Sequence, residues 1–106
     1  MLVEREIKEL ANKKEYNKIF NYFHAEYTQV LKDFLIRNDV KINESDCLIN
    51  YIIKTRAFMP EYTKYTIPIT KAMYNEQFTE EMKYELLMNS YSKIINVLVN
   101  KENNNG

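Results

Sequence analysis

Hydrophobic residues recur at helical spacing along most of the chain, and the clearest run covers residues 15–37. Its apolar positions are separated by steps of four and three residues: Tyr16, Phe20, Phe23, Tyr27, Val30 and Phe34. At about 100° per residue these positions form a single stripe along one side of a helix. The pattern therefore predicts a long amphipathic helix over 15–37 whose stripe faces a protein core.

The same spacing predicts further helices over 3–11, 46–58, 60–76 and 80–100. Residues 46–58 are apolar around most of the circumference, so we expect this helix to be the most enclosed element. Asn43 or Ser45 is expected to cap it, and Thr79 to cap the last helix. The side-chain oxygens of these residue types accept hydrogen bonds from the free N–H groups of a first turn.

Pro68 lies inside the predicted helix over 60–76. It removes one backbone N–H and crowds the carbonyl of Lys64, so we expect a kink or break near residues 66–67. The links between helices are short, which favours antiparallel neighbours. The sequence thus predicts an all-α fold, a single compact up-and-down bundle of four to five helices in residues 1–100. We expect a polar disordered tail, KENNNG, in 101–106.

The composition supports this fold and excludes several kinds of function. Hydrophobic residues make up 45% of the chain, enough for a core, while one Gly and two Pro leave little material for tight turns. The shortage of Gly also excludes a phosphate-binding P-loop and a dinucleotide-binding fingerprint. Fifteen basic residues balance fifteen acidic ones, so no general positive field favours nucleic acid.

Three features bear on where the protein works. No apolar stretch approaches the roughly 20 residues of a membrane-spanning helix. The stretch MLVEREIKEL carries charges where a signal peptide has an apolar core. Cys47 is the only cysteine, so the chain cannot form an internal disulfide. We therefore expect a cytoplasmic protein.

His24, the only histidine, is the first candidate for catalysis or metal binding. It falls near the edge of the apolar arc of its helix, and Glu26 points away, so no orienting carboxylate is at hand. Cys47 lies near a predicted helix N-terminus but on the apolar face. We expect a packed or partly buried imidazole and a buried thiol, and we predict no catalytic residue, no metal site and no cofactor.

The nine tyrosines are the unusual feature of the composition. A tyrosine can pack in a core with its hydroxyl at the surface, or it can anchor an interface. Tyr22 projects from the polar side of its helix, which makes it a candidate contact. We take four tyrosines as the candidate interaction surface: Tyr22, Tyr62, Tyr65 and Tyr74.

Three stretches together cover nearly the whole chain: ELANKKEYNKIFNYFHAEYTQVLKDFLIRNDVKI, SDCLINYIIKTRAFMPEYTKY and FTEEMKYELLMNSYSKIINVLV. Their order and spacing resemble the HEPN domain family (higher eukaryotes and prokaryotes nucleotide-binding domain). They are similar in turn to the opening helix pair of that family, to its short third helix with a Pro-started fourth, and to its closing helix.

The resemblance implies a member without nuclease activity. Ribonuclease members of the family place an Arg and, a few residues later, a His around the end of the fourth helix. Here that region reads TKAMYNEQF, with Lys71 in place of the Arg and Tyr74, Asn75 or Gln77 in place of the His. Members without these residues serve as dimerising or partner-binding modules, often beside a nucleotidyltransferase or within toxin–antitoxin and phage-defence systems. The start of the last helix, Phe78–Thr79–Glu80–Glu81, also resembles bacteriocin immunity proteins.

We therefore expect a non-catalytic helical module that binds itself or another protein, as a HEPN-like partner or regulator. One alternative is a bacteriocin-immunity-type or other inhibitor-binding bundle. A second is a divergent ribonuclease that uses His24 or Tyr74. A third is a nucleic-acid binder, which requires Lys64, Lys71 and Lys83 to converge in space.

Overall fold

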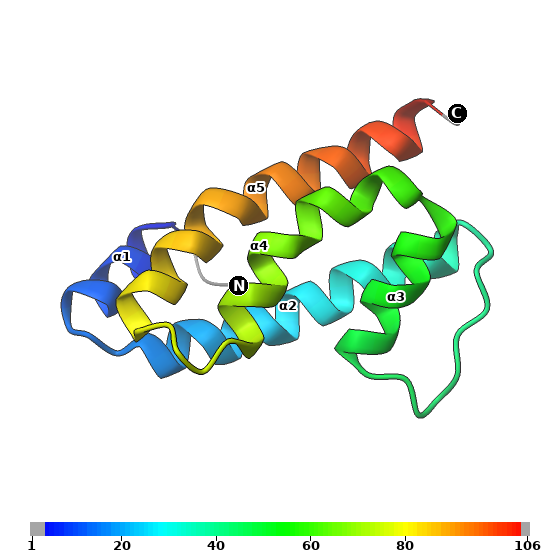
Figure 1. Ribbon diagram of the computed structural model, residues 1–106. Coiled ribbons are helices and arrows are strands. Elements are labelled where there is room, and N and C mark those ends of the chain that lie inside the picture. The colour runs from blue at the N-terminus through cyan, green and yellow to red at the C-terminus, as the bar shows by residue number, and fades with distance from the viewer. Residues whose placement is uncertain (1–3, 105–106) are drawn as a thin grey trace.

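The computed structural model describes residues 4–104 of the 106-residue chain, and this part is helical without strands (Figure 1). Its elements are α1 (Glu4–Asn12), α2 (Tyr16–Arg37), α3 (Leu48–Phe58), the 3₁₀ turn η1 (Pro60–Tyr62), α4 (Thr63–Tyr74) and α5 (Glu80–Asn104). The predicted all-α bundle is confirmed. Thr79 also caps α5 as predicted, because its Oγ1 accepts a hydrogen bond from the Met82 N–H at 3.2 Å.

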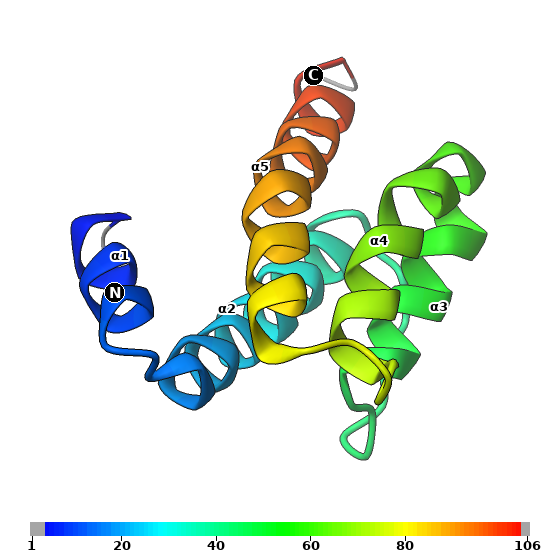
Figure 2. The same cartoon turned by 60° about the vertical axis from the view of Figure 1, so that its left-hand side comes forward.

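The helices pack around α2. Helices α4 and α5 lie side by side and run in opposite directions, and α2 crosses beneath them (Figure 1). Helix α3 packs against α2, while α1 folds back on the start of α2 (Figure 2). The bundle thus has a central helix, a pair of long neighbours and a short first helix at its edge.

The predicted stripe of α2 is the centre of the core. Four of its six positions are buried, Tyr16, Phe23, Tyr27 and Phe34, while Phe20 and Val30 are half-buried. Ile19, Leu31 and Leu35 are buried beside the stripe. The other helices contribute the residues that meet this stripe: Leu48, Tyr51, Ile52, Met59, Tyr62, Ile69, Ala72, Leu87, Ile94 and Leu98. Burying a side chain of this size stabilises the fold by about 1.5–3 kcal/mol, so this layer dominates the stability.

Two tyrosines place a hydrogen bond inside this core. Tyr27 of α2 and Tyr62 of η1 are both fully buried, and their hydroxyls bond to each other. Burial raises the pKa of Tyr27 to about 12 and raises that of Tyr62 further, because an ionised phenolate has no water there. Tyr62 is therefore not a surface residue, and its place in the candidate interaction surface was wrong. The turn that starts at Pro60 directs it inward, where a second hydroxyl satisfies it.

A guanidinium joins α3 to α4. Arg56 Nε donates to Thr66 Oγ1 at 2.8 Å, and a second Arg56 nitrogen lies 3.5 Å from Thr70 Oγ1. The Thr66 hydroxyl in turn donates to the Thr63 carbonyl at 2.7 Å, so the buried side chain of Thr66 is fully satisfied. This network fixes the register of the two helices.

Helix α4 is continuous from Thr63 to Tyr74 with Pro68 inside it. Of the kink or break expected there, the break is absent. Only one backbone hydrogen bond is lost at an internal proline, and burial of Ile69 and Ala72 just beyond it holds the helix together. The irregular turn lies earlier, at η1.

Helix α5 continues to Asn104, beyond the end expected at residue 100, so residues 101–104 are helical. Residues 105–106 lie outside the described part. The Lys101 ammonium lies 5.9 Å from the centre of the Phe58 ring, which anchors the last turns. Helix α3 is not the most enclosed element, because Ile49 and Ile53 are 39% and 55% exposed on the side that α2 leaves uncovered.

The buried pair of hydroxyls gives a prediction about stability. Tyr27→Phe and Tyr62→Phe should each lower the free energy of unfolding by about 1–3 kcal/mol, because each leaves the other hydroxyl buried without a partner. The double variant should lose less than the sum of the two. Urea unfolding of the four proteins measures this as a double-mutant cycle.

Tyr65→Phe is the matched control, since Tyr65 is only half-buried and should change the free energy of unfolding by less than about 0.5 kcal/mol. Strictly additive losses for Tyr27 and Tyr62 would contradict the proposed coupling.

Candidate functional site

A groove runs between the first and last helices. No residue of α1 is fully buried, and α1 stands apart from α5 in Figure 2. Three adjoining hollows fill the space between α1, α2 and α5, and the largest has a volume of about 600 Å³. We call this feature the α1–α5 groove. Its apolar and aromatic lining consists mainly of Ile7, Ile19, Tyr22, Tyr84, Met88 and Tyr91.

Aromatic packing holds the floor of the α1–α5 groove in place. The Tyr91 ring lies edge-on to Phe23, with 4.7 Å between centroids, and edge-on to Tyr27 at 5.9 Å. Farther along, the Tyr84 ring lies 5.8 Å from that of Tyr16. Such contacts stabilise a ring beyond its burial and restrict its rotamers. The groove therefore presents an ordered surface.

Carboxylates surround the α1–α5 groove. Tyr22 donates a hydrogen bond to Glu26 Oε1 at 3.2 Å, and Glu26 lines the groove beside Tyr91. Burial first, and then the Glu26 carboxylate, raises the pKa of Tyr91. Glu4 contributes from α1. This side of the molecule is thus apolar at its base and acidic above.

The four tyrosines chosen from the sequence do not form one surface. Tyr22 lies in the α1–α5 groove, while Tyr62 is in the core. Tyr65 is half-buried under the Lys64 ammonium, which lies 5.1 Å from its ring centre. Tyr74 is 50% exposed and lies nine positions after Tyr65, which places the two on opposite sides of α4. The structure therefore supports Tyr22 alone as part of a larger lining.

The other members of that lining were missed in the sequence. Tyr84, Met88 and Tyr91 fit the apolar pattern of the last helix, and that pattern leaves open whether they lie in the core or at an interface. In the structure they are half-buried, because α1 has few apolar side chains and covers α5 incompletely. The sequence feature that indicates this exposure is the short first helix, which cannot cover the whole length of the 25-residue helix α5.

His24 lies in a separate, smaller pocket. The imidazole is exposed, which contradicts the expected packing, and it borders a space of about 180 Å³ between α2, α4 and α5. At the edge of the α2 stripe no neighbouring helix covers it. The charged neighbour lining this pocket is Lys83, and no carboxylate lines it. His24 therefore has no orienting acid among the lining residues.

Metal binding finds no support in the described residues, where no group of three His, Cys, Asp or Glu side chains comes together. Of the three lysines considered for nucleic acid, Lys64 and Lys71 are exposed two turns apart on α4. Lys83 lies instead in the His24 pocket.

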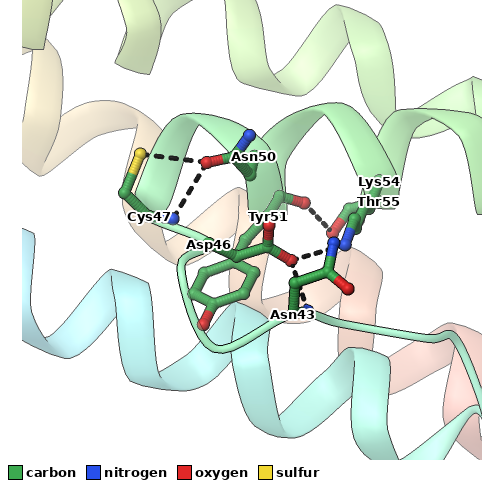
Figure 3. A network of polar contacts seen from close by, with 7 residues as sticks. All are labelled: Asn43, Asp46, Cys47, Asn50, Tyr51, Lys54 and Thr55. Carbon is green, nitrogen blue, oxygen red and sulfur yellow. Dashed lines mark hydrogen bonds and ion pairs between the residues drawn. The ribbon is translucent and has the colours of Figure 1, made fainter.

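Cys47 occupies the N-cap position of α3 (Figure 3). Its backbone N–H donates to Asn50 Oδ1 at 2.9 Å, and its thiol lies 3.1 Å from the same oxygen. The thiol is exposed and not buried as expected, because the N-cap position precedes the turns that face the core. Neither Asn43 nor Ser45 occupies that cap position.

Asp46 ties the preceding loop to the same helix (Figure 3). Its Oδ2 accepts hydrogen bonds from the Lys54 ammonium and from the Asn43 N–H, the latter at 2.8 Å. The Asp46 side chain is only 7% exposed and that of Lys54 26% exposed. The Lys54 hydrogen bond, followed by that from Asn43, lowers the pKa of Asp46. This network explains the chain path into α3 without a reactive group.

Comparisons with known proteins add no family. No protein-family model, no curated protein and no solved structure matches the chain. None of the helices within residues 4–104 has a stretch both long and apolar enough to cross a bilayer.

The Asp46 network gives a prediction about pH. A carboxyl whose pKa is lowered by folding stabilises the protein fully above its unfolded pKa of about 4 and loses that contribution as pH falls toward the folded value. Asp46→Asn should therefore lower the urea midpoint at neutral pH and flatten its decline below about pH 4. Urea unfolding across acidic pH measures both effects.

Glu44→Gln, an exposed carboxyl change in the same loop, is the control and should leave the acid-side slope close to that of the native sequence. An unchanged slope in Asp46→Asn would show that this ion pair has no share in acid stability.

The exposure of His24 gives a further prediction. His24→Ala should change the free energy of unfolding by no more than about 0.5 kcal/mol, because an exposed imidazole loses little packing. Phe23→Ala, one residue away but 4% exposed, should cost about 3–5 kcal/mol. Urea unfolding of both variants makes the comparison, and a similar loss for the two would mean that the imidazole is packed.

Proposed function

We propose that this protein is a non-catalytic helical module that binds another protein, or a second copy of itself, through the α1–α5 groove. The observation that carries the proposal is the groove itself. It is an ordered apolar surface formed by residues of three helices and left open to solvent. Tyr22 is the one sequence-predicted contact that lies in it.

The residue types of the lining favour this function over catalysis. Tyrosine and methionine are enriched where proteins meet, because they bury a large area with few rotatable bonds or adapt to a partner's shape. Burial of such apolar surface contributes about 25 cal/mol per Å², less the cost of association. The aromatic contacts under Tyr84 and Tyr91 reduce that cost, since these rings are already ordered.

The resemblance to HEPN domains supplies the wider setting of the proposal. In that setting the protein is a partner or regulator in a toxin–antitoxin or phage-defence type of system. A lone cysteine fits a reducing compartment, so the proposed site of action is the cytoplasm.

Site-specific crosslinking tests the proposal. Met88 is replaced by p-benzoylphenylalanine in the host, and the protein is irradiated in cells. We expect a discrete adduct with a partner or with a second copy, because position 88 lies in the α1–α5 groove. Ile7→Lys, which introduces a charge into the lining, should abolish that adduct.

The same photoreactive residue at Lys93, exposed on another side of α5, is the matched control and should give no adduct. Absence of any adduct at position 88, together with a strict monomer in sedimentation at micromolar concentration, would refute the proposal.

A further inference from the structure

We propose that the α1–α5 groove binds a basic amphipathic helix of a partner protein. This inference rests on the proposed function and specifies the chemistry of the partner.

The charge of the groove is the first argument. Four carboxylates line its three hollows, from Glu4, Glu26, Glu81 and Glu85, against the single ammonium of Lys8. Lys8 is itself paired with Glu4 at 3.3 Å. The whole chain carries equal numbers of acidic and basic residues, so this excess is a local property of the groove.

The pKa of a neighbouring tyrosine is shifted by the same negative charges. Tyr16 lines the end of the groove, and its pKa is raised first by burial and then by nearby carboxylates, with Glu81 the foremost. A negative potential of this kind attracts a cationic partner, speeds its association and rejects anionic ones.

The spacing of the lining is the second argument, and it specifies a helix. Four lining residues of α5 recur at steps of four, three and four: Glu81, Glu85, Met88 and Ser92. Tyr84, Asn89 and Tyr91 line the groove on either side of this row. Such a row is a ridge of the kind that packs into the surface of another helix. From position 81 to position 92 the ridge is about 16 Å long, which matches about three turns of an occupant. The half-buried Ile7 of α1 forms the opposite wall.

Charge also argues against a second copy of the chain as the occupant. In a two-fold dimer the same patch occurs on both partners. Such a dimer would place the acidic rim at Glu81 and Glu85 against an identical rim, and like charges at an interface oppose association.

A synthetic peptide provides the probe. It is an amphipathic helix of about four turns with Leu along one face, Lys on both flanks and one Trp. The matched control peptide has Glu at each Lys position. The protein contains no Trp, so the fluorescence of the peptide reports its binding without interference.

Two protein variants test the charges. Glu81→Lys/Glu85→Lys should weaken binding of the Lys peptide by about tenfold or more, and added salt should weaken binding to the native sequence. Glu44→Lys/Glu61→Lys makes the same change of net charge at exposed positions outside the groove and should alter affinity less than about twofold. Glu81→Gln/Glu85→Gln gives an intermediate loss and serves if the Lys pair unfolds the protein, as judged by circular dichroism.

The outcomes divide cleanly. Binding of the Lys peptide alone, lost on charge reversal in the groove and kept in the control variant, supports the inference. Equal binding of both peptides, binding of neither, or equal losses in both Lys variants overturns it. So does a dimer of the chain that Ile7→Lys dissociates and the peptide leaves intact.

The two proposals can also fail separately. An adduct at position 88 that Ile7→Lys removes and Glu81→Lys/Glu85→Lys leaves unchanged overturns the basic-helix inference and keeps the proposed function. Absence of that adduct, in a chain that stays monomeric, removes the proposed function, and binding of the Lys peptide to such a chain would be a surface charge effect.

Discussion

The buried stripe of α2 is the constraint on which the rest of the structure depends. Helix α1 folds onto its start, α3 packs along it, and α5 crosses it. Helix α4 adds Ile69 and Ala72 to the same core, and η1 meets α2 where the Tyr62 hydroxyl bonds to that of Tyr27. One long apolar surface thus organises the chain. Hydrophobic packing is not directional, and the buried hydrogen bond between Tyr27 and Tyr62 adds a directional contact to it.

Incomplete coverage of that framework creates the candidate interaction surface. Helix α1 has nine residues and buries none of them completely, so it covers the neighbouring face of α5 only in part. Tyr84 and Met88 would lie in the core if the first helix were longer and more apolar. They remain at the surface while aromatic contacts hold the floor beneath them. A rigid, partly covered apolar face is what a partner helix requires.

The residues that most resemble reactive groups have structural explanations. Cys47 and Asp46 build the start of α3. The Cys47 N–H donates to Asn50 Oδ1, and Asp46 accepts from the Asn43 N–H and the Lys54 ammonium. His24 is exposed beside Lys83 and has no carboxylate among the residues of its pocket. The polar network at Arg56 joins two helices. Each of these groups either holds a helix in place or is exposed to solvent. The α1–α5 groove is therefore the better candidate for a functional site.

The sequence by itself determined where the helices lie, because periodicity and capping are local properties of the chain. The long helix over 15–37 and the cap at Thr79 are confirmed almost residue by residue. Tertiary structure alone decided which side of each helix is covered. Ile53 and His24 are exposed, although both lie among apolar residues of their helices, and Tyr62 is buried, although it was expected at the surface. A hydrophobic pattern specifies a face, and only the placement of the neighbouring helices decides whether that face becomes core or surface.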